Sequence, residues 1–327
     1  MSRRALAGLV AVAALAAAPP SRALAQAQFP SGPIEIIAPA SPGGGWDSTA
    51  RVIQSVLQGQ GIVKVPVTVV NRPGGGGQVG WSYLNEHMGN PHFAAMNSNQ
   101  LFPRQLSGQS KMKFEDFTPL ARLTTEWIVL AVRSDSPYKT GKDFLEALKG
   151  DPAKHSVGIG SGLASSDHVS FLRAAKAAGV DARRVRIVVY PSGGDQMAAI
   201  LGGHVDAVST GLSEAAEQAK AGKLRMIAIT SPERAKDAPD VPTWKEMGIE
   251  GTWYHWRGIM GPGKLEPPHV EAWDRMLGQL VKSAAWKEEL EKRGWTDAYL
   301  DSKAFTKYLQ EEREGFATVM RDVGMIK

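Results

Sequence analysis

The sequence contains no cysteine. This absence excludes disulfide bridges, thiolate metal sites, a cysteine nucleophile and lipid attachment through a terminal cysteine. The seven histidines show no H-x-x-x-H or H-E-x-x-H spacing, so we expect no metal site and no cofactor. After the N-terminal segment, no apolar run approaches the ~20 residues that a membrane-spanning helix requires.

The chain has 327 residues, of which 43% are hydrophobic and 22% are charged. This composition is that of a globular protein rather than a disordered or fibrous one. The length is sufficient for two domains of ordinary size.

Residues 1–25 have the pattern of a secretory signal peptide. Arg3 and Arg4 precede a stretch of small and apolar residues over 5–18, followed by two prolines and Ala23-Leu24-Ala25. We therefore expect cleavage before Gln26 and a soluble protein in the periplasm. Cleavage removes three arginines and no acid, which lowers the net charge from +5 to +2. A nearly neutral mature chain gives no support to a nucleic acid partner.

From residue 33 onward, apolar runs rich in β-branched residues alternate with segments of helical periodicity. This alternation predicts an α/β fold with largely parallel sheets. Strands are expected at 34–38, 65–70, 92–96, 127–132, 157–160, 186–189, 207–210, 224–230 and 253–260. Helices are expected from about 48 to 59, from the end of the 71–77 loop to about 88, and at 140–149, 166–178, 195–201 and 213–221. A capping box is expected at 243–246. Three charge-rich helices without strands of their own should follow residue 267.

The repeat of this pattern predicts two lobes. Residues 26–126 together with 255–327 should form lobe 1, and residues 127–254 should form lobe 2. The chain would cross between them near Trp127 and Trp253, and these crossings would act as a hinge.

Four loops between a strand and a helix are rich in glycine or serine: 42–47, 73–77, 160–166 and 190–195. Exposed N–H groups and the positive end of a helix dipole favour a carboxylate or phosphate at such a loop. In open α/β sheets, ligands bind at these strand ends, so we expect a cleft for a small anion. The candidate ligand-binding residues are Gly43, Gly44, Gly45, Trp46, Asp47, Thr49, Asn97, Ser161, Ser165, Ser166, His168, Tyr190, Ser192 and Gly193.

Two enzymatic interpretations compete with binding. The segment 75–80 fits G-x-G-x-x-G, but no acid follows at about 20 residues to hold a ribose, which disfavours a dinucleotide site. A secreted hydrolase could use His168 with a serine of 160–166 as nucleophile. We prefer that His168 donates a hydrogen bond to a neighbouring loop or to the ligand. We also expect Asp47 and Arg51, four residues apart on one helix, to form an ion pair.

Several segments resemble the Bug or TctC family, the periplasmic solute-binding receptors of tripartite tricarboxylate transporters. The similar segments are 34–51 with Pro42-Gly43-Gly44-Gly45-Trp46-Asp47, 71–77 with Gly80, 158–168, 202–206, and 240–244 with Glu246 and Gly248. The resemblance implies a two-lobed venus-flytrap fold of the periplasmic-binding-protein type, similar to type II. It implies a receptor without catalysis or cofactor that closes on a small di- or tricarboxylate such as citrate. Main-chain amides and hydroxyls would hold the ligand, and membrane subunits of the transporter would receive it. We expect the protein to act as a monomer.

The chain departs from the family pattern in two places. Arg72 stands where many members carry lysine, and the turn at 190–195 lacks the Tyr-Arg-Gly or Tyr-Lys-Gly of the family. Asp195 adds a negative charge near the expected cleft, which would repel a multiply charged ligand unless this residue caps its helix.

Overall fold

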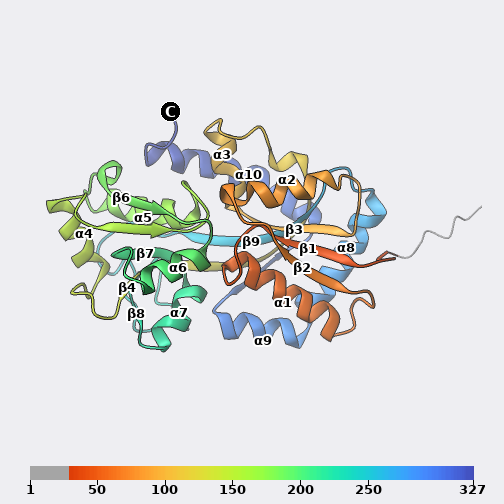
Figure 1. The fold of residues 1–327 in the computed structure, drawn as a ribbon, viewed down its shortest axis with the longest axis horizontal. Helices are drawn as coiled ribbons and strands as arrows, with labels where there is room; N and C mark the ends of the chain where they lie inside the picture. Colours follow the sequence, from red (N-terminus) through yellow and green to blue (C-terminus); the bar gives the residue numbers. More distant parts are fainter. Residues whose placement is uncertain (1–28) are drawn as a thin grey trace, which may run out of the picture.

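The computed structural model describes residues 29–327, and the predicted signal peptide lies outside this range. The molecule is elongated and consists of two α/β lobes that lie side by side (Figure 1). The strands follow the order β2-β1-β3-β9-β4-β7-β5-β6, with β10 and β8 each paired to β4. The fold is therefore mixed α/β with two lobes, as the alternation of strands and helices predicted.

Lobe 1 is built on a sheet in which β1 pairs in parallel with both β2 and β3, while β9 runs antiparallel to β3. Its strands are β1 (Ile34–Ala38), β2 (Val67–Asn71), β3 (Phe93–Ser98), β9 (Tyr254–Gly261) and β10 (Thr296–Leu300). Its helices are α1 (Gly45–Gly59), α2 (Gln78–Glu86), α3 (Phe102–Leu106), α8 (Pro267–Lys282), α9 (Ala284–Arg293) and α10 (Ser302–Asp322), with 3₁₀ turns η1 (Gly75–Gly77), η2 (Asn99–Leu101) and η3 (Phe114–Asp116).

Lobe 2 is built on a second sheet in which β5 pairs in parallel with β6 and β7. Its strands are β5 (Ser156–Ile159), β6 (Arg186–Val189), β7 (Ala207–Gly211) and β8 (Leu224–Ile229). Its helices are α4 (Gly141–Gly150), α5 (Ser166–Ala177), α6 (Gly193–Leu201) and α7 (Leu212–Lys220), with the 3₁₀ turn η4 (Ala182–Arg184).

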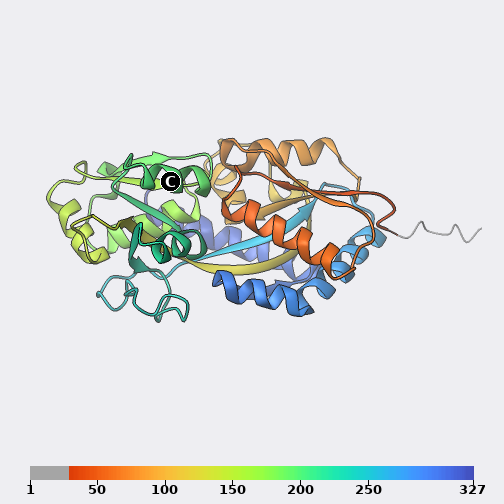
Figure 2. The same cartoon turned by 60° about the horizontal axis from the view of Figure 1, so that its bottom comes forward.

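The long strand β4 (Thr118–Arg133) joins the two sheets (Figure 2). Its first part pairs antiparallel with β9 and β10 in lobe 1, and its second part pairs antiparallel with β7 and β8 in lobe 2. The expectation of largely parallel sheets is therefore wrong, because strands that cross between lobes enter each sheet against the direction of its βα units. The strand predicted at 127–132 is also too short. The N-terminal half of β4 contains polar residues, and pairing with β9 holds these residues in the sheet.

Three other features differ from prediction. Helix α1 begins three residues early because Gly44 is its N-cap and the Asp47 carboxylate accepts the Gly43 amide at 3.0 Å. Strand β10 interrupts the expected series of C-terminal helices. Its sequence is only weakly apolar and does not indicate a strand, but pairing with β4 holds it in the sheet. At 243–246 the reciprocal bonds of a capping box form between Thr243 and Glu246, but they close a turn rather than open a helix.

Lobe 1 buries the larger apolar core, in which Trp81, Trp256, Trp273 and Trp286 are among the largest fully buried side chains. Core packing thus accounts for most of the tryptophans, as expected for large apolar side chains. The second sheet has an apolar cluster on each face. No helix among residues 29–327 is both long and apolar enough to cross a membrane.

Candidate functional site

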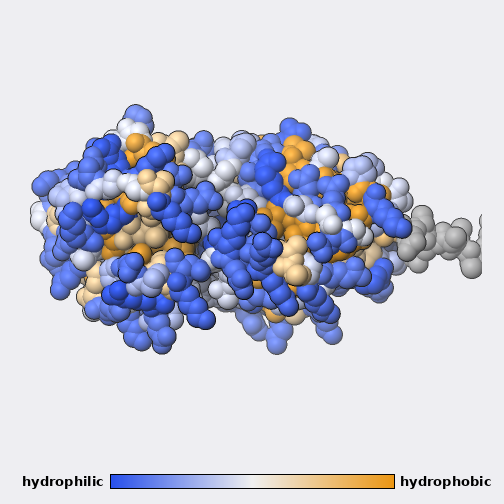
Figure 3. All heavy atoms as spheres, turned by 90° about the horizontal axis from the view of Figure 1, so that it is seen from below, coloured by the Kyte–Doolittle hydropathy of each residue, from blue (hydrophilic) through white to orange (hydrophobic). Residues whose placement is uncertain are grey.

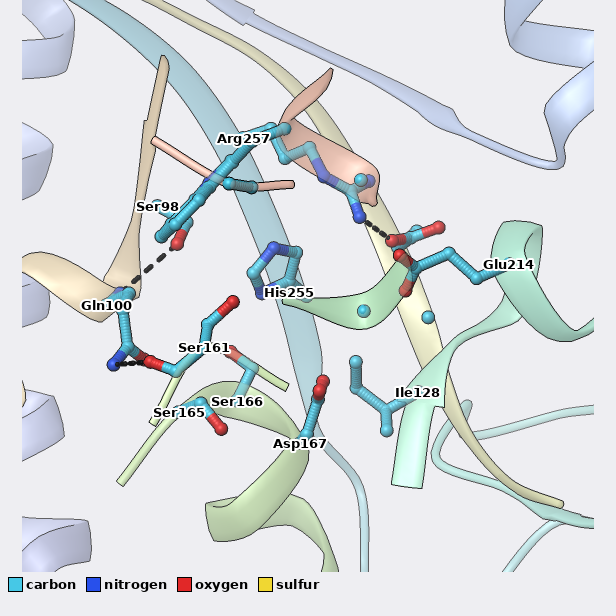
Figure 4. A pocket seen from close by; sticks show the side chains of 16 residues that line it. Ser98, Gln100, Ile128, Ser161, Ser165, Ser166, Asp167, Glu214, His255 and Arg257 are labelled. Carbon is cyan, nitrogen blue, oxygen red and sulfur yellow. Dashed lines mark hydrogen bonds and ion pairs between the residues drawn. The ribbon is translucent and has the colours of Figure 1, made fainter. Parts of the chain in front are cut away.

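The N-terminal ends of α1, α5, α6 and α7 surround a cavity of ≈ 40 Å³ between the lobes (Figure 4). Each of these helices follows a strand directly or through a short loop, so the strand ends bring their first turns together. The cavity is lined from both lobes by Ala40, Gly45, Trp46, Ser98, Gln100, Glu126, Ile128, Ser161, Ser165, Ser166, Asp167, Gly193, Gly211, Glu214, His255 and Arg257.

Side-chain hydrogen bonds connect the lobes at several points around this cavity. Gln100 Nε2 donates to the Ser161 carbonyl oxygen at 2.7 Å. On either side of this contact, Ser166 Oγ donates to Asn99 Oδ1 at 2.6 Å and Ser41 Oγ donates to Asp195 Oδ2 at 2.9 Å. The lobes are therefore closed on one another, and these bonds must break when they separate.

Gln100→Ala should weaken ligand binding by about 0.5 to 1.5 kcal/mol, the usual net value of one hydrogen bond. The Gln100–Ser161 bond joins the lobes, so its loss destabilises the closed state that holds a ligand. Gln54→Ala is the matched control, because Gln54 Nε2 donates to the Val67 carbonyl oxygen within lobe 1 at 2.6 Å. Calorimetric titration should show weaker binding for the first variant alone; equal losses in both would contradict a role in closure.

Six of the predicted ligand-binding residues line the cavity: Gly45, Trp46, Ser161, Ser165, Ser166 and Gly193. The indole of Trp46 also packs edge-on against Trp81, with ring centroids 5.6 Å apart, so it belongs partly to the core. Gly43 instead borders an outer groove. The remaining candidates do not line the cavity: Gly44, Asp47, Thr49, Asn97, His168, Tyr190 and Ser192.

Asp47 organises the first helix. Its pairing with Arg51 is confirmed, with Arg51 Nη2 and Asp47 Oδ1 2.9 Å apart. Burial raises the pKa of the Asp47 carboxyl, but hydrogen bonds from Arg51, the Gly43 amide and Asn71 outweigh burial and lower it below its ordinary value. Thr49 likewise stays within the helix, donating to the Gly45 carbonyl oxygen at 2.8 Å.

Asp195 lies in the first turn of α6 and does not cap the helix. Ser192 is the N-cap of α6, and its Oγ donates to Asp195 Oδ2 at 2.8 Å. Ser41 Oγ donates to the same carboxylate oxygen from the opposite lobe. The negative charge of Asp195 is thus held by hydroxyl groups beside the cavity rather than directed into it.

His168 is buried behind the 161–164 loop and accepts a hydrogen bond there. Its Nδ1 accepts the Ala164 amide at 3.0 Å, so this ring nitrogen accepts from the loop rather than donating to it. The bond holds a turn in which Ser161 and Ala164 both have φ of 60°. Burial lowers the pKa of His168 to about 4, and the neutral ring with Nδ1 occupied is a poor base for a serine in 160–166.

His168 should make the fold sensitive to acid. As pH falls from 7, the unfolded chain binds a proton near pH 6.5 while the folded ring stays neutral down to about 4. The stability conferred by the neutral ring is thus present above pH 6.5 and lost toward pH 4, by about 3 kcal/mol. His168→Asn keeps an acceptor for Ala164 and should lose this pH dependence in denaturant unfolding. His204→Asn, at an exposed position, should retain it; equal slopes for both variants would refute the assignment.

The charged residues that line the cavity were not singled out from the sequence: Glu126, Asp167, Glu214, His255 and Arg257. The one signal for Glu126 and Arg257 is that each interrupts an apolar strand, where charged side chains are rarely buried unless paired.

Arg257 and Glu126 form an ion pair inside the molecule. Their side chains are 4% and 0% exposed, and Arg257 Nη2 contacts Glu126 Oε1. Ser213 Oγ donates to the other carboxylate oxygen at 2.7 Å. Within residues 29–327, Arg257 Nε and Nη1 have no hydrogen-bond partner. The guanidinium group therefore lines the cavity with donors to spare.

Three glycines allow the charged side chains to approach the backbone closely. A Cβ on Gly45 would lie 2.1 Å from Arg257 Nη2, and a Cβ on Gly193 would lie 2.2 Å from Glu214 Oε1. A Cβ on Gly211 would lie 2.3 Å from Glu126 Oε1. These positions need glycine because the ionisable side chains occupy the space of a methyl group.

Asp167 and Glu214 face the cavity from α5 and α7 (Figure 4). Both residues are partly buried. Burial and then the Glu214 charge raise the pKa of Asp167 well above its ordinary value. Burial also raises the pKa of Glu214, although Arg257 acts in the opposite direction. Burial, followed by the charge of Arg257, lowers the pKa of His255 well below its ordinary value.

An outer groove of ≈ 440 Å³ adjoins the cavity and shares Gly193 and Glu214 with it. It is bordered by α7 and by residues 291–294 at the end of α9. Seen from below, the molecule has a mainly hydrophilic surface with apolar residues in patches on each lobe (Figure 3). Glu214 therefore lines both the cavity and the groove.

The fold and the closed cleft define a two-lobed solute-binding protein of the periplasmic type. A solved structure of a periplasmic transporter is 25% identical and superimposes with a TM-score of 0.82, over 91% of this chain and 99% of that chain. MatC from Rhodopseudomonas palustris with bound malate is 22% identical, with a TM-score of 0.79 over 89% of this chain and 99% of that chain. BugT from Bordetella pertussis is 26% identical over 309 residues, which cover 90% of each chain.

Residues 49–325 match the tripartite tricarboxylate transporter family receptor, known as TctC. The match spans most of the chain, so the protein belongs to this family. The resemblance of its loops to the Bug and TctC receptors is thereby confirmed.

Proposed function

We propose that this chain captures a small di- or tricarboxylate outside the cytoplasm and delivers it to the membrane subunits of a tripartite tricarboxylate transporter. The observation that carries the proposal is the buried Arg257, whose Nε and Nη1 have no partner among the described residues. A guanidinium group binds carboxylates through parallel N–H donors.

Backbone groups around Arg257 support the proposal. Gly45 and Gly193 line the cavity in the first turns of α1 and α6. Helix N-termini favour anions because unpaired N–H groups and the helix dipole point toward them. MatC, which shares the fold, holds malate. Citrate, the ligand expected from the sequence, belongs to the same chemical class.

Ligand capture would use opening and closing of the lobes. A cavity of ≈ 40 Å³ holds little more than a water molecule, so the lobes must separate before a carboxylate enters. The crossing strands β4 and β9, which lie side by side between the lobes, would carry the hinge near Trp127 and Trp253. In this proposal lobe 1 comprises 26–126 and 255–327, lobe 2 comprises 127–254, and the protein acts as a monomer.

The proposal includes no catalytic step. His168 is neutral and hydrogen-bonded to the Ala164 amide, which does not favour the alternative of a hydrolase. A pH-dependent turnover that disappears in His168→Asn would support the hydrolase instead.

The proposal can be tested by a thermal-shift screen of the mature protein after unfolding and refolding to remove bound ligand. The screen would contain carboxylates, sugars, nucleotides and amines without a carboxylate. A ligand at 100 times its Kd should stabilise the fold by about 2.7 kcal/mol. Stabilisation by carboxylates is the expected result, and a response confined to sugars, nucleotides or simple amines would overturn the function.

A further inference from the structure

Acidic groups outnumber basic ones in the cavity. Glu126, Asp167 and Glu214 line it, whereas Arg257 is its one arginine or lysine. The remaining ionisable side chain in the lining, His255, has a pKa lowered well below its ordinary value by burial and then by Arg257, so it adds no positive charge at neutral pH. When Asp167 and Glu214 are ionised, this balance does not suit a ligand that carries only negative charge.

The basic group is already engaged by one of the acids. Arg257 pairs with Glu126, whose other oxygen accepts from Ser213. Asp167 and Glu214 receive hydrogen bonds only from neutral groups within the described residues. Asp167 Oδ2 accepts the Gly160 amide at 3.0 Å, and Glu214 Oε2 accepts from Thr210 Oγ1 at 2.8 Å. The backbone of Gly45, from the opposite lobe, also forms a hydrogen bond with the Glu214 carboxylate and acts to lower its pKa.

The helix N-termini around the cavity also carry acids of their own. The first turns of α1, α5, α6 and α7 each contain one, namely Asp47, Asp167, Asp195 and Glu214. A carboxylate in the first turn offsets the positive end of the helix dipole. The attraction of these helix ends for further anionic groups is correspondingly reduced.

We propose that the ligand carries a cationic nitrogen in addition to its carboxylate, and that Asp167 and Glu214 bind this nitrogen. The inference rests on the proposed function, since Arg257 and the glycine amides bind the carboxylate end. Glu214 lies across the cavity from Ser98 and Gln100, and Asp167 enters the cavity from α5 beside Ser166 (Figure 4). The ligand is thus a carboxylate that bears an ammonium or amidinium group.

An organic cation suits the arrangement better than a metal ion. Within residues 29–327, no group of three or more histidine, aspartate or glutamate side chains converges in a way that could hold a metal. The acids are distributed around the cavity, so each can accept hydrogen bonds from a different N–H of one ammonium group. Closure desolvates Asp167 and Glu214 together, and a cation bound between the lobes relieves that cost.

The test compares matched ligands by calorimetric titration of the refolded mature protein. Malate and aspartate differ by the exchange of a hydroxyl for an ammonium group. Two further pairs extend the comparison to other chain lengths: glutarate with glutamate, and butyrate with 4-aminobutyrate. The aminated member of at least one pair should bind tenfold or more tighter than its partner. Tighter binding of the unaminated member in every pair that binds would overturn the inference and leave the proposed function standing.

Charge-removing variants locate the effect. Asp167→Asn and Glu214→Gln keep the size of each side chain and should each reduce the preference for the aminated ligand by tenfold or more. Glu217→Gln makes the same change at an exposed position on α7 and should leave the preference unchanged. Thermal unfolding of each variant verifies folding, and a preference unaffected by both cavity substitutions would also overturn the inference.

Two further measurements distinguish other origins of the same selectivity. Affinity for the aminated ligand should increase between pH 5 and 8, as Asp167 and Glu214 ionise in the presence of His255, Glu126 and Arg257. A decrease in affinity would mean that Asp167 and Glu214 bind the ligand in their protonated form. Binding should persist in EDTA, and binding that requires Mg²⁺ would show that a metal supplies the positive charge. If no carboxylate with or without an amine binds, the proposed function fails together with the inference.

Discussion

Arg257→Met should lower the free energy of unfolding by about 3 to 5 kcal/mol, because it leaves the Glu126 carboxylate buried without its counter-ion. The two side chains are 4% and 0% exposed, so water does not replace the lost partner. Adding Glu126→Gln to the same chain should restore most of the stability, since the amide removes the charge and can still accept from Ser213. Equilibrium unfolding in denaturant measures both changes.

An exposed pair of the same residue types provides the control. Arg234 donates from Nε to both oxygens of Glu246, and both side chains are 46% exposed. Arg234→Met should cost no more than about 1 kcal/mol, as is usual for ion pairs in contact with water. If Arg257→Met cost no more than this control, the buried pair would not be a major contributor to stability.

Gly45→Ala should weaken ligand binding by about 1.5 to 3 kcal/mol, the value of a hydrogen bond to a charged group. The added methyl group would lie 2.1 Å from Arg257 Nη2, so the guanidinium group must move away from its position in the cavity. This cost arises although alanine is the better helix former, and the backbone of Gly45 needs no positive φ.

Gly59→Ala, at the other end of α1, distinguishes the steric effect of the added methyl group from the effect of alanine on helix stability. A Cβ on Gly59 would meet no atom within 4 Å, so Gly59→Ala should leave affinity unchanged and stabilise the helix by up to about 1 kcal/mol. Calorimetric titration and thermal unfolding of both variants provide the comparison. Unchanged affinity in Gly45→Ala would mean that Arg257 does not contact the ligand.

Three of the four loops that the sequence singled out border one cavity, but the charged side chains of this cavity were not predicted. The loops at 42–47, 160–166 and 190–195 all supply residues to the cavity, since glycine and serine patterns at strand ends are local signals. The 73–77 loop instead faces lobe 2, where a Cβ on Gly76 would lie 2.6 Å from the Ser161 carbonyl oxygen. Local patterns do not reveal which side of a loop faces the ligand.

The sequence by itself determined the alternation of strands and helices, the two-lobed α/β class and the glycine-rich turns, because these depend on periodicity and on neighbouring residues. Only the tertiary structure decided the charges in the cleft. Glu126 and Arg257 are separated by 131 positions in the chain and meet because β4 and β9 pair antiparallel in the register that places Glu126 opposite His255. Strand register and the packing of α5 and α7 against it depend on contacts between distant residues, and such contacts leave no local pattern in the sequence.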